Sequence, residues 1–253
     1  MIMNRLQARV SNHFRPDKGV VCWSVLLVLF SLLMTIPVIS AGQTGDVDFV
    51  LERMIEAYGG RQNLRKLNNS VQKWDIRTLS SNKRGSDVRS ILIPGRLKVE
   101  LSYPDNTEMR VLNGESAHVV FSGKASRTAS APQRDAMRLQ LMRMYSPLVL
   151  GTKRDALTLT LEDKWCGLAL IENGIRVDYL VDMETWRIVN ALGRMSFGGT
   201  EMQFLTKYSD FHFRDGVLVH EQESKHAGGV NTAVLKLRSM RFDAGLGDLD
   251  FTR

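Results

Sequence analysis

Two hydrophobic periods alternate along the chain and predict where helices and strands lie. After Asp46, apolar residues in 47–58 recur at intervals of three and four, which is typical of an amphipathic helix with Asp46 as its N-cap. Gly59-Gly60 supplies a left-handed stop, and Leu64 and Leu67 predict a shorter helical turn beyond it. This first helix has one apolar stripe, so it needs a sheet to cover it.

From Val71 onward the period changes to two, as where Leu97, Val99 and Leu101 alternate with charged residues. Turn residues such as Asn113-Gly114 recur at intervals of roughly ten residues, too short for parallel crossovers, and therefore favour antiparallel hairpins. About eleven strand-like runs result, which is more than a flat sheet accommodates without curling. In 200–213 the apolar set changes phase, which predicts a bulge near Ser209-Asp210.

A second helix is predicted between the two groups of strands, within 125–150. Met137, Leu141, Met144 and Leu148 fall on one face of this helix, whereas Leu139 and Met142 lie off that stripe. A helix that is apolar on more than one side either is a buried connector or contacts both the sheet and a transient ligand. We therefore predict a mainly β (α+β) domain in which a strongly curved antiparallel sheet forms an unclosed half-barrel with helices on its concave face.

The first 41 residues have the layout of an export signal. A basic stretch ending at Lys18 precedes Val20–Ile39, twenty residues without a charge, and Ser40-Ala41-Gly42 follows. We expect cleavage near Ala41 and a periplasmic product. Twenty residues also suffice to span about 30 Å of hydrocarbon, so an uncleaved inner-membrane anchor stays open. Residues 42–253 form the predicted domain.

Charge and cysteine content narrow the class of protein further. The chain has 253 residues and a net charge of +7, from 34 basic and 27 acidic residues; four of the basic residues and one of the acidic lie before residue 42, which leaves 30 and 26. This surplus is too modest and too dispersed for a nucleic-acid footprint. After Cys22 the only cysteine is Cys166, so no intramolecular disulfide is expected within the domain, and Cys166 is best interpreted as a small apolar filler.

Chemical motifs do not favour an enzyme. The sequence contains no Gly-x-Ser-x-Gly elbow, phosphate-binding loop, Cys-x-x-Cys pair or His-Glu-x-x-His segment. Ser70-Val-Gln-Lys73 stands at a strand entrance, whereas the penicillin-interacting enzymes need a helix start there. His212, His220 and His226 have the spacing of a metal site, but Glu221 and Glu223 should face the opposite side, so we interpret the histidines as solvated. Neither a cofactor nor a metal is expected.

The order of parts resembles the outer-membrane lipoprotein carrier (LolA/LolB-like) superfamily, whose members include outer membrane lipoprotein-sorting proteins. Residues 50–60 with Leu64 and Leu67 are similar to its opening helix, Gly-Gly and short helix. Residues 177–189 resemble its paired strands joined by an Asp-led turn, and 208–219 its strand, bulge and Asp-Gly hairpin. The resemblance extends over 47–251 and consists of packing motifs.

This resemblance implies a monomeric periplasmic carrier that holds lipid, or the acyl chains of lipoproteins, in a hydrophobic cavity under a helical lid. An inner-membrane transporter or an outer-membrane acceptor would be its partner in outer-membrane biogenesis. No gating or catalytic residue is transferred. Periodicity alone selects the candidate cavity residues: Leu51, Met54, Leu97, Val99, Leu101, Met137, Leu141, Met144, Tyr179 and Phe204.

Two other hypotheses stay open. A membrane-anchored envelope-stress sensor with the same fold would retain Val20–Ile39, because a shuttle must diffuse and a tethered sensor need not. A periplasmic hydrolase would require a polar cluster in the cleft, and its function would be lost on replacing His212, His220 or Cys166. N-terminal sequencing of the envelope protein separates the shuttle from the sensor.

Overall fold

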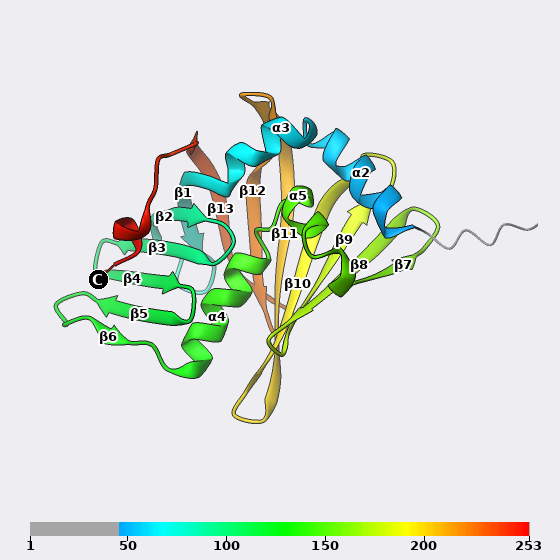
Figure 1. Cartoon of the computed structure of the whole chain (residues 1–253). Coiled ribbons are helices and arrows are strands. Elements are labelled where there is room, and N and C mark those ends of the chain that lie inside the picture. Colours follow the sequence, from blue (N-terminus) through cyan, green and yellow to red (C-terminus); the bar gives the residue numbers. More distant parts are fainter. Residues whose placement is uncertain (1–45, 253) are drawn as a thin grey trace, which may run out of the picture. The chain divides into compact units, whose positions relative to one another are not determined.

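The computed structural model describes residues 46–252, and all of them belong to one compact unit. The predicted export segment lies outside the described residues. Figure 1 shows a curved sheet with helices lying across one of its faces. The helical elements are α2 (Val47–Ala57), α3 (Gly60–Arg65), η1 (Lys66–Asn68), α4 (Ala131–Met142), α5 (Pro147–Gly151), η2 (Arg154–Ala156) and η3 (Asp248–Phe251). None of the described helices is long and apolar enough to cross a membrane.

The strands are β1 (Asn69–Thr78), β2 (Arg84–Leu92), β3 (Arg96–Tyr103), β4 (Asn106–Asn113), β5 (Ser116–Phe121), β6 (Arg127–Thr128), β7 (Leu157–Leu161), β8 (Trp165–Glu172), β9 (Ile175–Asp182), β10 (Arg187–Phe197), β11 (Thr200–Arg214), β12 (Val217–Ala227) and β13 (Val230–Phe242). They form one antiparallel sheet in the order β6-β5-β4-β3-β2-β1-β13-β12-β11-β10-β9-β8-β7. Within the described chain the edge strands β6 and β7 do not pair, so the sheet is an unclosed barrel, as predicted.

The predicted number of strands was slightly too low. The alternating pattern predicts one strand-like run around Val219 with Leu237, but Gly228 and Gly229, both at positive φ, turn the chain there and divide it into β12 and β13. The two-residue strand β6 carries no hydrophobic period, so the pattern could not indicate it.

The N-terminal helix follows the prediction. Asp46 caps α2, its side chain accepting a hydrogen bond from the backbone N–H of Asp48. Gly59 ends the helix at φ 101°, and a Cβ there would lie 2.0 Å from the carbonyl oxygen of Gly216. Only glycine therefore fits at this crossing of the helix end over the β11–β12 turn.

The second predicted helix is two helices. Ser130 and Gln133 form a capping box at the start of α4, which ends at Met142, and Ser146 with Pro147 then starts α5. Met144 therefore lies in the link between the helices and Leu148 in α5, so the expected single stripe is wrong. Leu139 and Met142, the residues off the stripe, are both buried, because α4 packs on the sheet and against the rest of the core.

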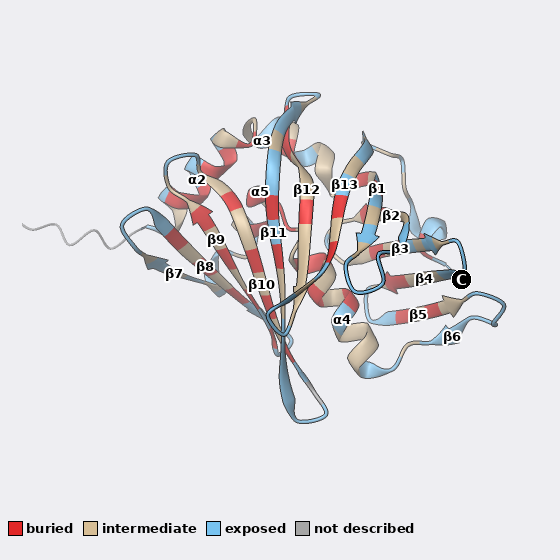
Figure 2. Cartoon of the chain, turned by 180° about the vertical axis from the view of Figure 1, so that it is seen from behind, coloured by how far each residue is buried: buried red, intermediate tan, exposed pale blue. Residues whose placement is uncertain are grey.

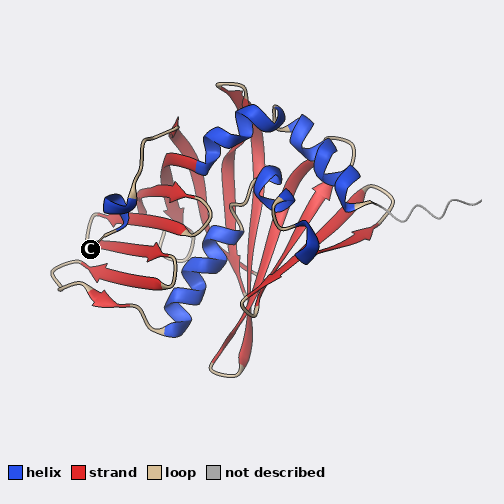
Figure 3. Ribbon diagram, viewed as in Figure 1, coloured by secondary structure: helices blue, strands red, loops and turns tan. Residues whose placement is uncertain are grey.

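The main core fills the concave side of the sheet. It joins residues of α2, of α4 and α5, and of strands from both halves of the sheet. Figure 3 shows the helices together over this face, and Figure 2, from behind, shows that buried residues alternate with exposed ones along the strands. α4 packs tightly against Gly193 of β10, where a Cβ would lie 2.3 Å from Cδ1 of Leu139.

The irregularity predicted near Ser209-Asp210 is a kink without an inserted residue. Asp210 has φ 59°, and Ser209 pairs with Gln222 and Phe211 with His220, so the register is the same on both sides. The kink changes which residues face the concave side: Tyr208 and Phe211 do so on β11, and Glu223 and His220 on β12. The phase change in the sequence was thus a correct signal, but a bulge was the wrong explanation.

Candidate binding site on the concave face

The structure brings the ten predicted cavity residues into one core. Leu51, Met54, Leu97, Val99, Met137, Leu141 and Tyr179 are buried members of the main cluster, and Leu101, Met144 and Phe204 pack against it half-buried. In this conformation their side chains pack against one another and fill the space between the helices and the sheet. Whether they contact a ligand stays a prediction.

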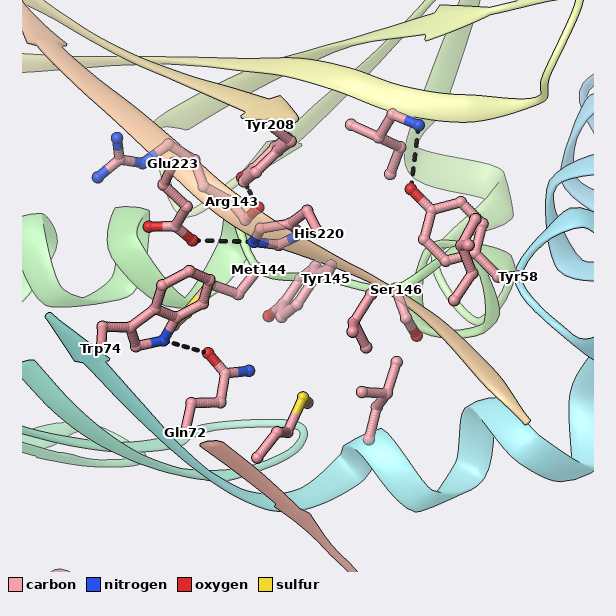
Figure 4. A pocket seen from close by; sticks show the side chains of 15 residues that line it. Tyr58, Gln72, Trp74, Arg143, Met144, Tyr145, Ser146, Tyr208, His220 and Glu223 are labelled. Atoms are coloured by element: carbon pink, nitrogen blue, oxygen red, sulfur yellow. Dashed lines mark hydrogen bonds and ion pairs between the residues drawn. The ribbon is translucent and has the colours of Figure 1, made fainter. Parts of the chain in front are cut away.

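A pocket of about 80 Å³ lies between the sheet and the α4–α5 link (Figure 4). Its apolar wall includes Leu67, Leu218 and Met240, and its polar wall includes Arg143 and His220. Of the predicted cavity residues, Met144 lines it. An apolar cavity of about 150 Å³ binds benzene, and this pocket is about half that size, so it would have to widen to take up an alkyl chain.

Two buried tyrosines fasten the end of α4 to the sheet. The hydroxyl of Tyr179 on β9 donates to the carbonyl oxygen of Met142 at 2.6 Å, and that of Tyr208 on β11 donates to the carbonyl oxygen of Arg143 at 2.6 Å. Carbonyls at a helix C-terminus lack partners within the helix. The Tyr208 hydroxyl supplies one to Arg143, and the Tyr179 hydroxyl adds a second donor to the carbonyl of Met142, which also accepts from the backbone N–H of Tyr145 at 3.0 Å. Burial raises the pKa of both phenols well above 10, which keeps them protonated donors.

Beneath the link lies an ionic cluster, which we define as the buried residues Asp87, Arg89 and Glu223 with the half-buried Lys225. Arg89 binds Glu223 through two hydrogen bonds of 3.0 Å and donates to Asp87 at 2.7 Å, and Lys225 Nζ lies 2.8 Å from Glu223 Oε2. The side chains of Arg89 and Glu223 are each 1% exposed. Burial alone would raise the pKa of Glu223, but Arg89 and Lys225 hold it well below 4.5.

His220 is bonded to this cluster through Glu223, so its assignment as a solvated surface residue is wrong. Its Nε2 lies 3.0 Å from Glu223 Oε1, and its ring stacks on Trp74 with centroids 5.6 Å apart. The guanidinium of Arg89 also lies over the Trp74 ring in a cation–π contact, 5.0 Å from the ring centroid. The expectation that Glu223 faces away from His220 fails because the kink at Asp210 reverses the alternation between them.

The three histidines do not meet. His212 lies on the outer face beside Asp210, and with Glu221 these three could hold a metal ion geometrically. Arg214, however, already pairs with Glu221, with Nη2 to Oε1 at 2.5 Å, and a guanidinium at this distance opposes a cation. Cys166 is fully buried, as expected of a filler, and burial raises its thiol pKa to about 11.

The ionic cluster was not among the predicted site residues, although the sequence contains one signal for it. Asp87 and Arg89 stand in phase with Ile91 along β2, so the alternation placed two charged residues at inward positions. Charges at core positions predict a buried partner. That partner, Glu223, lies 134 residues away from Arg89 and could be identified only from the fold.

The comparisons with known proteins agree on the fold. A LolA superfamily protein from Nitrosomonas europaea is 14% identical, covers 82% of this chain and 97% of its own, and aligns with a TM-score of 0.54. A Vibrio parahaemolyticus domain named for outer membrane lipoprotein sorting is 10% identical, with the same coverage and a TM-score of 0.51. No protein-family profile and no curated protein matches the sequence. The chain therefore shares the unclosed β-barrel fold of these two structures.

Proposed function

We propose that this chain is a periplasmic, non-enzymatic carrier, in which residues 42–253 hold a lipid or the acyl chains of a lipoprotein between the sheet and the helices. The observation that supports this is the apolar core on the concave face, which we call the trough, where Met54, Met137 and Met144 pack between the helices and the sheet. Methionine side chains adapt to irregular occupants. Each methylene buried there contributes about 0.8 kcal/mol without any catalytic group.

An acyl chain can enter only if the α4–α5 segment moves. The pocket under the link is the place where a small displacement would join existing free volume to the trough, because Met144 and Tyr145 lie in its wall. The hydroxyls of Tyr179 and Tyr208 hold that segment closed. In our proposal, cargo replaces the contacts that α4 makes with the sheet, and the two hydrogen bonds break on opening.

The polar groups near the pocket support binding rather than catalysis. Glu223 accepts hydrogen bonds from Arg89, lies in an ion pair with Lys225 and is bonded to His220, so its lone pairs are already used. A general base needs a free acceptor within reach of a substrate proton. This cluster thus organises the floor of the trough.

Native mass spectrometry tests the proposal on the full chain released from its own envelope. We expect a co-purifying acylated species. Met144→Glu should abolish this adduct, because it places a charge in the trough wall, and Leu249→Glu, at a residue 85% exposed on η3, should retain it. Absence of any acylated adduct, or equal retention in both variants, would count against a carrier.

A further inference from the structure

The outer face of the sheet carries a second site, which we call the basic cleft. Arg77 and Arg84, with Lys236 and Arg238 of β13, line a cleft of about 670 Å³ together with Asp75. Trp74 and Ile76 of β1 pack in the core on the concave side, so the intervening Asp75 and Arg77 face outward. The cleft therefore lies behind the trough, on the opposite face of the same strands.

The positive charge of this cleft is not neutralised. Asp75 is its single acidic residue, and Arg238 occupies it with an ion pair of Nη2 to Oδ1 at 2.5 Å. Within 46–252, Arg77, Arg84 and Lys236 have no carboxylate within 4.0 Å. Four cations and one acid give the cleft +3, whereas all of 42–253 carries +4.

Arg77 and Arg84 also stand directly opposite one another in the β1–β2 pairing. Like charges at directly opposed positions destabilise a sheet. A sequence that keeps this pair exposed, without an acid beside it, has the arrangement expected of an anion-binding surface. Both guanidiniums present several donors suited to phosphate oxygens.

Exposed apolar side chains lie at the hairpin tips next to the cleft. Leu79, on the β1–β2 tip, is 36% exposed and Val230, at the start of β13, is 67% exposed. The two tips touch, because the backbone N–H of Leu79 donates to the carbonyl oxygen of Thr232 at 2.9 Å. Cations beside exposed apolar residues are the composition of a surface that binds the membrane interface.

From these observations we infer that the basic cleft and the tips at Leu79 and Val230 dock the domain on an anionic phospholipid bilayer. Phosphate headgroups would occupy the cleft, and the two tips would enter the acyl boundary. Free phosphate would use the cations and leave the apolar tips without a role. The docked face is opposite the trough, so α4 would stay free to move while the protein rests on a membrane.

The test uses a local probe, because the hydrophobic run Val20–Ile39 can itself bind vesicles. The full chain with Cys22→Ser and Val230→Cys is labelled with an environment-sensitive fluorophore; Cys166 is fully buried and stays unreacted. The matched control carries the label at Leu249→Cys. Vesicles contain phosphatidylglycerol and phosphatidylethanolamine, or phosphatidylcholine alone.

The emission of the label at position 230 should shift to the blue with phosphatidylglycerol vesicles only. The shift should reverse at about 0.5 M salt, where the Debye length is roughly 5 Å and attraction between exposed charges is largely screened. Arg77→Gln with Arg84→Gln should weaken this response about 30-fold, since each basic residue near an anionic surface contributes about fivefold. Urea unfolding checks that this exposed double variant folds.

Four results would overturn the inference: an equal response to phosphatidylcholine, an equal response of the label at 249, an unchanged response in the folded double variant, or a response abolished by inorganic phosphate at the same ionic strength. The last result would identify a free-phosphate site. None of these readouts involves acyl cargo, so failure here leaves the proposed carrier function standing.

Discussion

The part of the sheet formed by β1, β2, β12 and β13 has charged residues on both faces. They are paired on the concave face and largely unpaired on the outer face. On the concave side, the buried Arg89 is bonded to Asp87 and Glu223, and the half-buried Lys225 pairs with Glu223. On the outer side, Arg77 and Arg84 are exposed and face one another with no acid within 4.0 Å among the described residues. The charges of the ionic cluster neutralise one another, and the outer charges accumulate.

This difference separates structural from functional charge. A buried ion without a partner costs several kcal/mol, so inward charges survive only as a closed set. An exposed ion costs little without a partner, so an unpaired group of like charges on the surface is free to serve a ligand. Polar residues in the trough are therefore poor evidence for an enzyme, whereas the basic cleft is good evidence for an anionic partner.

The largest effect on stability should come from removing the central carboxylate of the ionic cluster. Glu223→Gln removes the carboxylate shared by Arg89, Lys225 and His220 and leaves buried positive charge behind. We expect the free energy of unfolding to fall by about 3–5 kcal/mol, measured by urea denaturation.

Glu221→Gln, two residues away on the same strand, is the matched control. It breaks an ion pair with Arg214, whose side chain is 38% exposed, and should cost less than about 1 kcal/mol. Equal losses of stability for the two variants would show that burial does not make the ionic cluster more important for stability than the exposed Glu221–Arg214 pair.

Lys225 makes the stability contribution of the ionic cluster depend on pH. Burial, partly offset by Glu223, lowers the pKa of Lys225 from 10.5 to about 8. The unfolded chain therefore binds more protons above pH 8, and stability should rise with pH, by about 2 kcal/mol between about pH 7.5 and 9.5. Above pH 10 the tyrosines, whose pKa values burial raises, should reverse this trend.

Unfolding measured across this range should show the rise in the native chain and its loss in Lys225→Met, where stability should fall slightly above pH 9 because burial raises the pKa of the Cys166 thiol to about 11. A native profile that falls between pH 8 and 9.5 would contradict the depressed pKa.

A smaller effect is expected from the hydrogen bond that closes the trough. Tyr208→Phe leaves the carbonyl of Arg143 without its donor and should lower the free energy of unfolding by about 1–2 kcal/mol. It should also speed amide hydrogen exchange in α4, because the helix end is released. Tyr103→Phe serves as the comparison, since the Tyr103 hydroxyl makes no hydrogen bond within 46–252. Unchanged exchange in α4 would mean that Tyr208 does not hold the helix.

The smallest effect, and the only gain, should come from the outer face. Arg77→Gln removes the opposition to Arg84 and should raise the free energy of unfolding by a few tenths of a kcal/mol. The gain should vanish at high salt, because both side chains are exposed. A loss of stability instead would mean that Arg77 has a structural partner.

Hydrophobic period and turn residues were enough to predict the half-barrel and its helices, because each signal is local. They could not separate α4 from α5, since Ser146-Pro147 was read within a longer apolar stripe. They also placed Glu223 on the wrong face of the sheet. Alternation assumes regular strands, whereas the paired strand β11 kinks at Asp210, whose φ is 59°. The ionic cluster joins β2 to β12, and the basic cleft joins β1 and β2 to β13; both depend on strand order, which no single segment encodes.

The central claim, that α4 must leave the sheet for cargo to enter, can be tested with one disulfide. A Cβ at Gly193 would lie 2.9 Å from Cγ of Leu139, so cysteines at these two positions come within disulfide reach. In the full chain carrying Leu139→Cys and Gly193→Cys, a fluorescent long-chain fatty acid should bind after reduction and fail to bind after oxidation. Equal binding in both states would contradict our account of the trough.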